Sequence, residues 1–272
     1  IMNQAAKLRF MMGGAPSIPL VLRMVSGGGI RLGAQHSQSL EALFAHLPGL
    51  VVVMPSSPFD AKGLLAAAIQ GDNPVVFLEQ KQLFFAEPEP VPAERYGIEL
   101  GVGRIVREGS DVTVVALGAL VPQAVRAARE LESEGVSLEV VDPRTLAPLD
   151  TGLIAASVAK TGKLVVAHEA TRFCGFGAEI ASHVAEQCFW DLDAPVVRIG
   201  APSHPIPYHK DLEAATLPGT AEITAAVRSS TPSGIRASPA VGTTTSSANA
   251  PKRPVPVTRS PTAKSSTSSP VS

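Results

Sequence analysis

The sequence predicts an α/β fold of two doubly wound domains followed by a disordered tail, and three observations lead to this prediction. Apolar runs of strand length alternate with helical patterns over residues 18–79. The same alternation resumes at residue 111. This order is typical of parallel sheets covered by helices on both faces. The composition favours a large buried core, because 45% of the residues are hydrophobic and only 17% are charged.

The first half contains a well-marked helix start. Ser57 is placed to be an N-cap, Pro58 suits the first helical position, and Asp60 completes a capping box. Residues 2–14 resemble the middle of a helix followed by the glycines that end it. The other expected elements are strands at 18–24, 50–55 and 74–79 and helices at about 39–47 and 57–69. We expect residues 1–85 to form the first domain.

The second half repeats the pattern after a linker. Residues 86–110 are rich in proline and charged residues, and we interpret them as a crossing between domains. The second domain is predicted to span residues 111–228. Its expected elements are strands at 111–118, 137–142, 163–170 and 195–200 and helices at 120–135, 151–162, 175–190 and 220–230.

The last segment has a different composition. Of the 44 residues in 229–272, 26 are serine, threonine or proline, and none is aromatic. Such a segment buries too little apolar surface to offset its conformational entropy, so we predict that it is disordered. Its five basic residues leave 18 basic and 24 acidic residues in 1–228. The predicted folded part is therefore mildly acidic.

Several classes of function are disfavoured. An acidic folded part gives no support for nucleic-acid binding. Apolar runs such as residues 50–54 are far shorter than the roughly 20 residues of a membrane-spanning helix. Cys174 and Cys188 match neither a disulfide framework nor a zinc spacing, so we expect a reducing, cytoplasmic compartment.

His36 is the main candidate for chemistry. It lies in the loop that leaves the predicted strand 18–24, and ligands bind beyond the carboxyl ends of strands in open α/β sheets. Its imidazole could move a proton, or it could only cap the following helix. The loop glycines, Gly27, Gly28, Gly29 and Gly33, would let the backbone approach a ligand or a partner chain closely.

Other polar residues suggest no complete catalytic set. His168 ends the predicted strand 163–170 beside Glu169, and we expect its ring to be satisfied by neighbouring polar groups. The sequence has no His-Glu-x-x-His motif, no cysteine pair and no evident carboxylate cluster, which disfavours a transition-metal site. The glycines of GFGAEI at 175–180 have the wrong spacing for a dinucleotide fingerprint.

Six longer motifs carry a resemblance to a known family. They are NQAAKLRFMMGG, the run from PLVLRM through GAQHSQSLEALF to GLLAAAI, DNPVVFLEQKQLF, EGSDVTVVALG, VVDPRTLAPLD and HEATRFCGFGAEI. Together they resemble the beta subunits of the thiamine-diphosphate-dependent 2-oxo acid dehydrogenases, which act on pyruvate, branched-chain 2-oxo acids or acetoin. The resemblance covers roughly residues 2–228.

The resemblance implies a pyrimidine-binding domain, a transketolase-like carboxy-terminal domain and an alpha2 beta2 heterotetramer. It places His36 and Gln38 of the HSQ motif in the thiamine diphosphate site, with magnesium held by the alpha subunit. It implies oxidative decarboxylation of a 2-oxo acid and acyl transfer to lipoyl-lysine, with His36 handling protons. The carboxy-terminal domain is expected to help dock the lipoyl acyltransferase core.

The resemblance also implies a structural potassium ion held by backbone carbonyls. Gly71 stands where an acidic residue is usual, although a carbonyl ligand needs no particular side chain. The expected ligands are Leu20, Ala68, Ile69, Gly71 and Asn73.

Other interpretations stay open. The family's essential glutamate falls before NQAAK, so we expect that the chain lacks an amino-terminal part and functions only in longer form. An acetoin dehydrogenase subunit suits VVDPRTLAPLD and AQHSQ, whereas QCFWDLDAP favours the branched-chain type. Two hypotheses come from other functional classes. The chain would then be a non-catalytic truncated remnant or an independent small-molecule binding domain.

Overall fold

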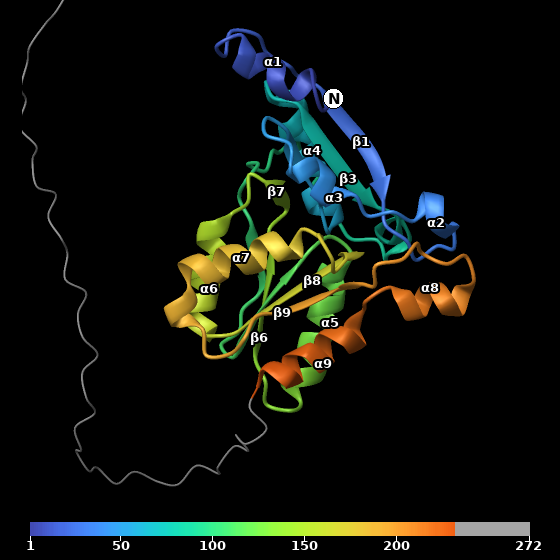
Figure 1. The fold of residues 1–272 in the computed structure, drawn as a ribbon, viewed down its shortest axis with the longest axis vertical. Helices are drawn as coiled ribbons and strands as arrows, with labels where there is room; N and C mark the ends of the chain where they lie inside the picture. The colour runs from blue at the N-terminus through green and yellow to red at the C-terminus, as the bar shows by residue number, and fades with distance from the viewer. Residues whose placement is uncertain (232–272) are drawn as a thin grey trace, which may run out of the picture. The chain divides into compact units, whose positions relative to one another are not determined.

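Two sheets of mainly parallel strands form the fold in the computed structural model, which describes residues 1–231 (Figure 1). The first sheet has the order β1-β3-β2-β7, with β7 antiparallel to β2. Its strands are β1 (Val21–Ser26), β2 (Val51–Val53), β3 (Val75–Gln80) and β7 (Thr145–Ala147). The helical segments of this half are α1 (Ala5–Met11), α2 (Gly33–His36), α3 (Glu41–Ala45), α4 (Pro58–Gln70) and the 3-10 helix η1 (Lys81–Phe85).

The second sheet has the order β4-β6-β5-β8-β9, and only β4 is antiparallel to its neighbour. Its strands are β4 (Arg104–Arg107), β5 (Val112–Ala116), β6 (Leu138–Asp142), β8 (Leu164–Thr171) and β9 (Val197–Ala201). Helices α5 and α9 pack together on one face, and α6 and α7 on the other. The helical segments are α5 (Leu120–Glu132), α6 (Thr151–Thr161), α7 (Gly177–Gln187), η2 (Phe189–Asp191), α8 (Lys210–Thr216) and α9 (Thr220–Ser230). The structure confirms the predicted α/β class with two parallel sheets.

Local sequence signals explain where several helices begin and end. The Oγ atom of Ser57 accepts a hydrogen bond from the backbone N–H of Asp60 at 3.1 Å, as the capping box predicts. Asp150 caps α6 in the same way, and its Oδ1 atom accepts from the Leu153 N–H at 3.0 Å. Gly162 ends α6 with a φ of 68°, a conformation that glycine adopts without steric strain.

Some elements differ from the sequence prediction. The helix expected at about 39–47 spans only Glu41–Ala45, and α2 precedes it. Strand β4 lies inside the segment 86–110 that we interpreted as a linker, and β7 and α8 were not expected. Both unexpected strands are short and pair antiparallel with strands far away in the sequence, so no local pattern marks them.

The predicted tail falls mostly outside the described residues. Helix α9 continues to Ser230, so the first two residues of the segment 229–272 are helical. The prediction of disorder for residues 232–272 lies outside the part of the chain that the structure describes. Within that part, we find no helix whose length and apolar content would let it cross a bilayer.

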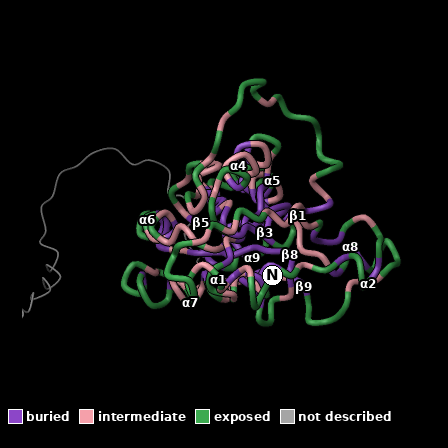
Figure 2. Tube along the Cα trace, turned by 90° about the horizontal axis from the view of Figure 1, so that it is seen from above, coloured by how far each residue is buried: buried purple, intermediate pink, exposed green. Residues whose placement is uncertain are grey.

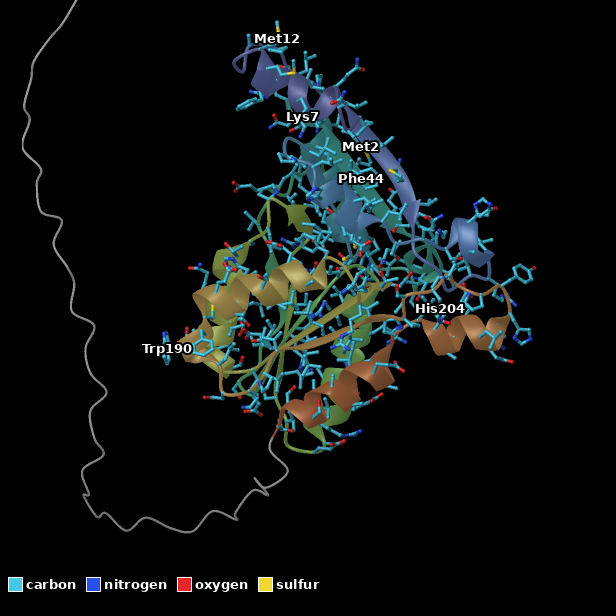
Figure 3. All side chains as sticks on the ribbon, in the orientation of Figure 1. Met2, Lys7, Met12, Phe44, Trp190 and His204 are labelled. Carbon is cyan, nitrogen blue, oxygen red and sulfur yellow. The ribbon has the colours of Figure 1, made fainter. Side chains whose placement is uncertain are left out.

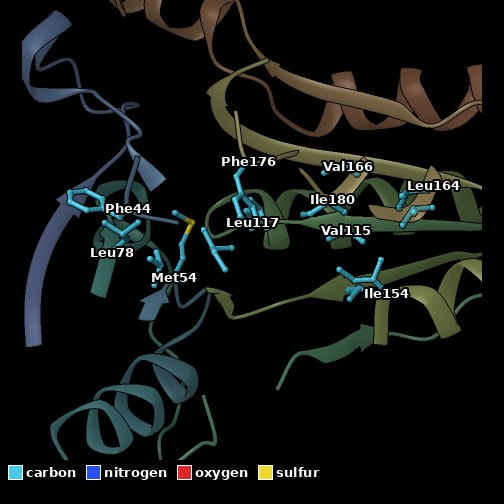
Figure 4. Packing of buried hydrophobic residues seen from close by; sticks show 14 of the residues in the cluster. Phe44, Met54, Leu78, Val115, Leu117, Ile154, Leu164, Val166, Phe176 and Ile180 are labelled. Carbon is cyan, nitrogen blue, oxygen red and sulfur yellow. The ribbon is translucent and has the colours of Figure 1, made fainter. Parts of the chain in front are cut away.

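One hydrophobic cluster joins the two sheets. Met54, which directly follows β2, and Leu78 of β3 pack in the same cluster as Leu117, Phe176 and Ile180 from the second half (Figure 4). Buried segments gather around β3, β5 and β8, while exposed loops lie at the periphery (Figure 2). The two halves are therefore one packed body, and the ends of both sets of strands help to form the candidate site.

Candidate functional site

The loop after β1 carries the two residues predicted to contact the cofactor. β1 ends at Ser26, residues 27–32 form a glycine-rich loop, and α2 runs from Gly33 to His36. The loop leaves the carboxyl edge of the first parallel sheet, where ligands bind in open α/β folds. The structure thus places His36 and Gln38 together at that edge.

His36 is exposed and lines a cavity of about 230 Å³. Gln38 lines the same cavity, and its Nε2 atom donates a hydrogen bond to the backbone carbonyl of Gln35 at 3.1 Å. Apolar walls come from Phe44, which Figure 3 labels, and from Leu78. The cavity is also lined by Met24, Val25, Ser26, Leu32, Leu40 and Lys81. Apolar walls with a few polar groups suit a flat heteroaromatic ring.

A second cavity connects the loop to the other half of the chain. Its volume is about 530 Å³, and Gln38 lines it as well as the first cavity. Glu169 from β8, Ala201 from β9 and His204 from the segment before α8 also line it. The site therefore draws on the carboxyl ends of strands from both sheets.

Buried charges lie behind the loop. Glu41, Glu169 and Glu213 are each no more than 3% exposed. Burial raises the pKa of Glu41 to about 7, and the nearby charge of Glu169 adds to this rise. Burial likewise raises the pKa of Glu169 and lowers that of Lys81, whose charge is partly stabilised by Glu169. Folding thus brings close together carboxyl groups that are far apart in the sequence, which no local motif indicates.

The loop glycines approach this same chain. A Cβ atom on Gly27 would lie 2.7 Å from Oε1 of Glu169, and Gly27 has a φ of 82°. At Gly29 a Cβ atom would overlap the side chain of Gln82. Close approach to Glu169 in the second half and to Gln82 in the first half thus favours glycine at these two positions. The expected approach of a ligand or a partner chain stays a prediction.

The five residues expected to bind potassium surround the start of β1, the end of α4 and the start of β3. The backbone carbonyl of Leu20 accepts a hydrogen bond from the Val75 N–H at 2.8 Å. The Oδ1 atom of Asn73 accepts from Nη1 of Arg9 at 2.9 Å. A guanidinium charge thus lies beside the predicted site, which also includes Ala68, Ile69 and Gly71. Among the described residues, no group of three or more His, Cys, Asp or Glu side chains is arranged to hold a metal ion.

His168 differs from its prediction. Its side chain is fully buried, and neither ring nitrogen has a hydrogen-bond partner in residues 1–231. The expectation that neighbouring polar groups satisfy the ring is therefore wrong. Gly175 and Gly177 pack directly against the imidazole and leave no room for a polar side chain there.

Comparison with known proteins identifies the family. Residues 2–86 match the transketolase pyrimidine-binding domain, and residues 101–223 match the transketolase C-terminal domain. The beta subunit of acetoin:2,6-dichlorophenolindophenol oxidoreductase from Cupriavidus necator is 46% identical over 228 residues, which cover 84% of this chain and 67% of that protein. The pyruvate dehydrogenase E1 component subunit beta of Bacillus subtilis is 41% identical over 223 residues, or 82% of this chain and 68% of that protein. This chain belongs to that family of beta subunits.

Another relative and a solved structure agree with this assignment. The acetoin oxidoreductase beta subunit of Bacillus subtilis is 46% identical over 218 residues, which cover 80% of this chain and 64% of that protein. The present beta subunit thus spans about two thirds of the length of these relatives. Its fold also matches a split-gene transketolase, described as an inactive beta4 tetramer, with a TM-score of 0.65 and 27% identity over 83% of this chain and 72% of that one.

Some polar residues around the loop of this beta subunit were not predicted from the sequence. Lys81 and Gln82 follow β3, and Glu213 lies on α8. Glu169 could have been found, because it lies near the carboxyl end of a predicted strand, at the edge of the sheet where ligands bind. Glu213 has no such signal, since it lies on a short helix whose contact with the loop is purely tertiary.

Proposed function

We propose that this chain is the beta subunit of the decarboxylating component of a 2-oxo acid dehydrogenase complex. It would act with an alpha subunit in an alpha2 beta2 assembly and use thiamine diphosphate. The reaction would be oxidative decarboxylation of a 2-oxo acid and transfer of the acyl group to lipoyl-lysine on the acyltransferase core. A cytoplasmic location belongs to the same proposal and rests on two cysteines that form no disulfide.

The observation that supports this proposal best is the setting of His36. The residue is exposed at the carboxyl edge of a domain that matches the pyrimidine-binding family, and it lines an open cavity with apolar walls. These surroundings fit the flat pyrimidine ring of thiamine diphosphate. His36 and Gln38 would hold that side of the cofactor, with magnesium held by the alpha subunit. When bound, the cofactor supplies the nucleophilic carbon and the electron sink.

His36 would hold and move a proton near the reacting carbon. Its exposure in this chain leaves the imidazole free to face a partner subunit that closes the cavity. Lys81, which lines the same cavity, would contribute positive charge close to an anionic substrate. The potassium ligands stay a prediction, and the adjacent Arg9 charge would weaken cation binding there.

A specific observation favours a second candidate, the beta subunit of an acetoin dehydrogenase. Two acetoin oxidoreductase subunits are 46% identical over 228 and 218 residues, whereas a pyruvate dehydrogenase subunit from Acholeplasma laidlawii has the same identity over 198 residues. Turnover of pyruvate, branched-chain 2-oxo acids and acetoin by the complex with its alpha subunit would separate the two. A non-catalytic remnant would assemble with the alpha subunit but turn over none of these substrates.

The role of His36 can be tested in the assembled component. His36→Ala should lower the rate of lipoyl acylation by about 100-fold, because a positioned proton donor or acceptor is lost. Assembly with the alpha subunit, measured by analytical ultracentrifugation, should not change. His183→Ala is the control, since His183 is on α7 and lines a different cavity. Equal turnover by the His36→Ala and unsubstituted proteins would refute the proposed role.

A further inference from the structure

The loop that carries His36 is attached to the second half of the chain through backbone N–H groups. The Gly28 N–H donates a hydrogen bond to Oε1 of Glu169 at 2.5 Å. The Gly29 N–H donates to Oε1 of Glu213 at 3.0 Å, and the Arg31 N–H donates to Oε2 of Glu213 at 2.9 Å. Two carboxylates from β8 and α8 thus hold three backbone donors within four consecutive residues of the loop.

The backbone conformation of the loop allows these hydrogen bonds. Gly27, Gly29 and Arg31 have positive φ values of 82°, 85° and 62°, and they alternate with residues of ordinary backbone conformation. Such alternation turns successive N–H groups toward one side, as in backbone nests that bind anions. Here the anions are side chains of the same protein. Helix α8 lies beside α2 in both Figure 1 and Figure 2, in agreement with these contacts.

The two carboxylates are buried, which makes their hydrogen bonds important. Glu169 and Glu213 are each 3% exposed, and buried carboxyl groups need hydrogen-bond partners. The N–H groups of Gly29 and Arg31 supply them for Glu213. Glu169 has two further donors, Oγ of Ser39 at 3.3 Å and Nε2 of Gln82 at 3.3 Å. Ser39 lies just after the HSQ motif, so Glu169 contacts the chain on both sides of His36.

We propose that Glu169 and Glu213 are positioning residues that hold the loop 27–39 in the conformation that presents His36 to the cofactor cavity. The inference rests on the proposed function, because it assigns these residues a task in the same site. Neither carboxylate needs to touch the substrate. They act through the backbone, since α2 starts two residues after Arg31 and ends at His36.

The first experiment measures the loop in the 272-residue chain itself. Amide hydrogen exchange of residues 28, 29 and 31 should become about tenfold faster or more in Glu169→Ala and Glu213→Ala, because the loop opens more often. Tryptic cleavage after the exposed Arg31 should accelerate in parallel. Glu169→Gln and Glu213→Gln should give intermediate values, since an amide oxygen still accepts a hydrogen bond.

The matched control is Glu222→Gln. Glu222 also accepts a backbone N–H, that of Gly219 at 2.8 Å, but it does so at the start of its own helix α9. This substitution should leave exchange in the loop unchanged. Amide hydrogen exchange in β5 reports unfolding of the whole protein. A variant that is unstable as a whole would therefore show faster exchange in β5 as well as in the loop. Unchanged loop exchange in both glutamine variants and both alanine variants would overturn the inference.

The second experiment uses the component assembled with its alpha subunit. Both alanine variants should lower kcat for lipoyl acylation about tenfold or more, because a misplaced catalytic group is costly. The glutamine variants should restore part of kcat. An equal loss of kcat in Glu222→Gln would contradict a positioning role. A different outcome is that the Glu169 and Glu213 variants show faster loop exchange while His36→Ala keeps full activity. That outcome would refute the proposed function but would still support the attachment of the loop.

Discussion

His168 shows how burial changes the chemistry of a single residue. Burial, together with the nearby charge of Arg198, lowers the pKa of His168 from its ordinary value near 6.5 to about 4. The imidazole is therefore neutral in the folded protein at neutral pH. In the unfolded chain it takes up a proton as the pH falls below about 6.5. Because only the unfolded state then binds the proton, His168 contributes stability above that pH, and this contribution is lost as the pH falls toward 4.

The first prediction follows from this linkage. Between pH 7.5 and 5.5, the unsubstituted protein should lose about 1 kcal/mol more free energy of unfolding than His168→Gln, which has no group to protonate at this position. Urea unfolding at the two pH values measures the difference. His204→Gln, which replaces an exposed imidazole, should behave like the unsubstituted protein. If the free energy of unfolding has the same pH dependence in His168→Gln and in the unsubstituted protein, the ring is not buried in its neutral form.

At the scale of elements, Asp60 joins α4 to the second half of the chain. It lies in the first turn of α4 and is completely buried. Its Oδ2 atom is 3.0 Å from Nη2 of Arg104 on β4, and its Oδ1 atom is 2.8 Å from Nη2 of Arg144, just after β6. Buried carboxylates need such partners because their desolvation is costly. The pair of arginines thus explains how an acidic residue fits inside this interface.

The second prediction concerns this ionic contact. Asp60→Asn should lower the free energy of unfolding by about 2 kcal/mol, below the roughly 3 to 5 kcal/mol of a fully buried pair, because both arginines keep some contact with water. Chemical denaturation measures the change. Glu134→Gln removes the exposed partner of Arg228 and should not shift the denaturation midpoint. Equal effects of the two substitutions would contradict the importance assigned to Asp60.

At the scale of the whole molecule, the two halves of the described chain are tied by strand pairing and by a shared core. Strand β7 follows β6 in the sequence but pairs with β2 in the first sheet. Met54, which directly follows β2, is 2% exposed and packs in the cluster that contains Leu117 and Phe176 (Figure 4). We therefore expect the two halves to unfold together.

The third prediction tests this coupling. Met54→Ala should lower the free energy of unfolding by about 3 kcal/mol, as is typical for removal of a large core side chain. Amide exchange should accelerate by the same factor in β3 and β8, because both depend on the shared core. Met12→Ala, at a residue that is 58% exposed on the segment after α1, should have no measurable effect (Figure 3). Faster exchange in β3 alone would mean that the halves unfold independently.

The sequence by itself determined the α/β class, most strands and helices, and the place of His36 on the exit loop of β1. These follow from apolar periodicity, from caps such as Ser57 and from the parallel-sheet rule, all of which act over short stretches of chain. Only the tertiary structure decided that Glu169 and Glu213 hold the loop and that β7 joins the first sheet. Contacts between residues more than 90 positions apart leave no periodic trace, because their geometry arises only when the two halves pack.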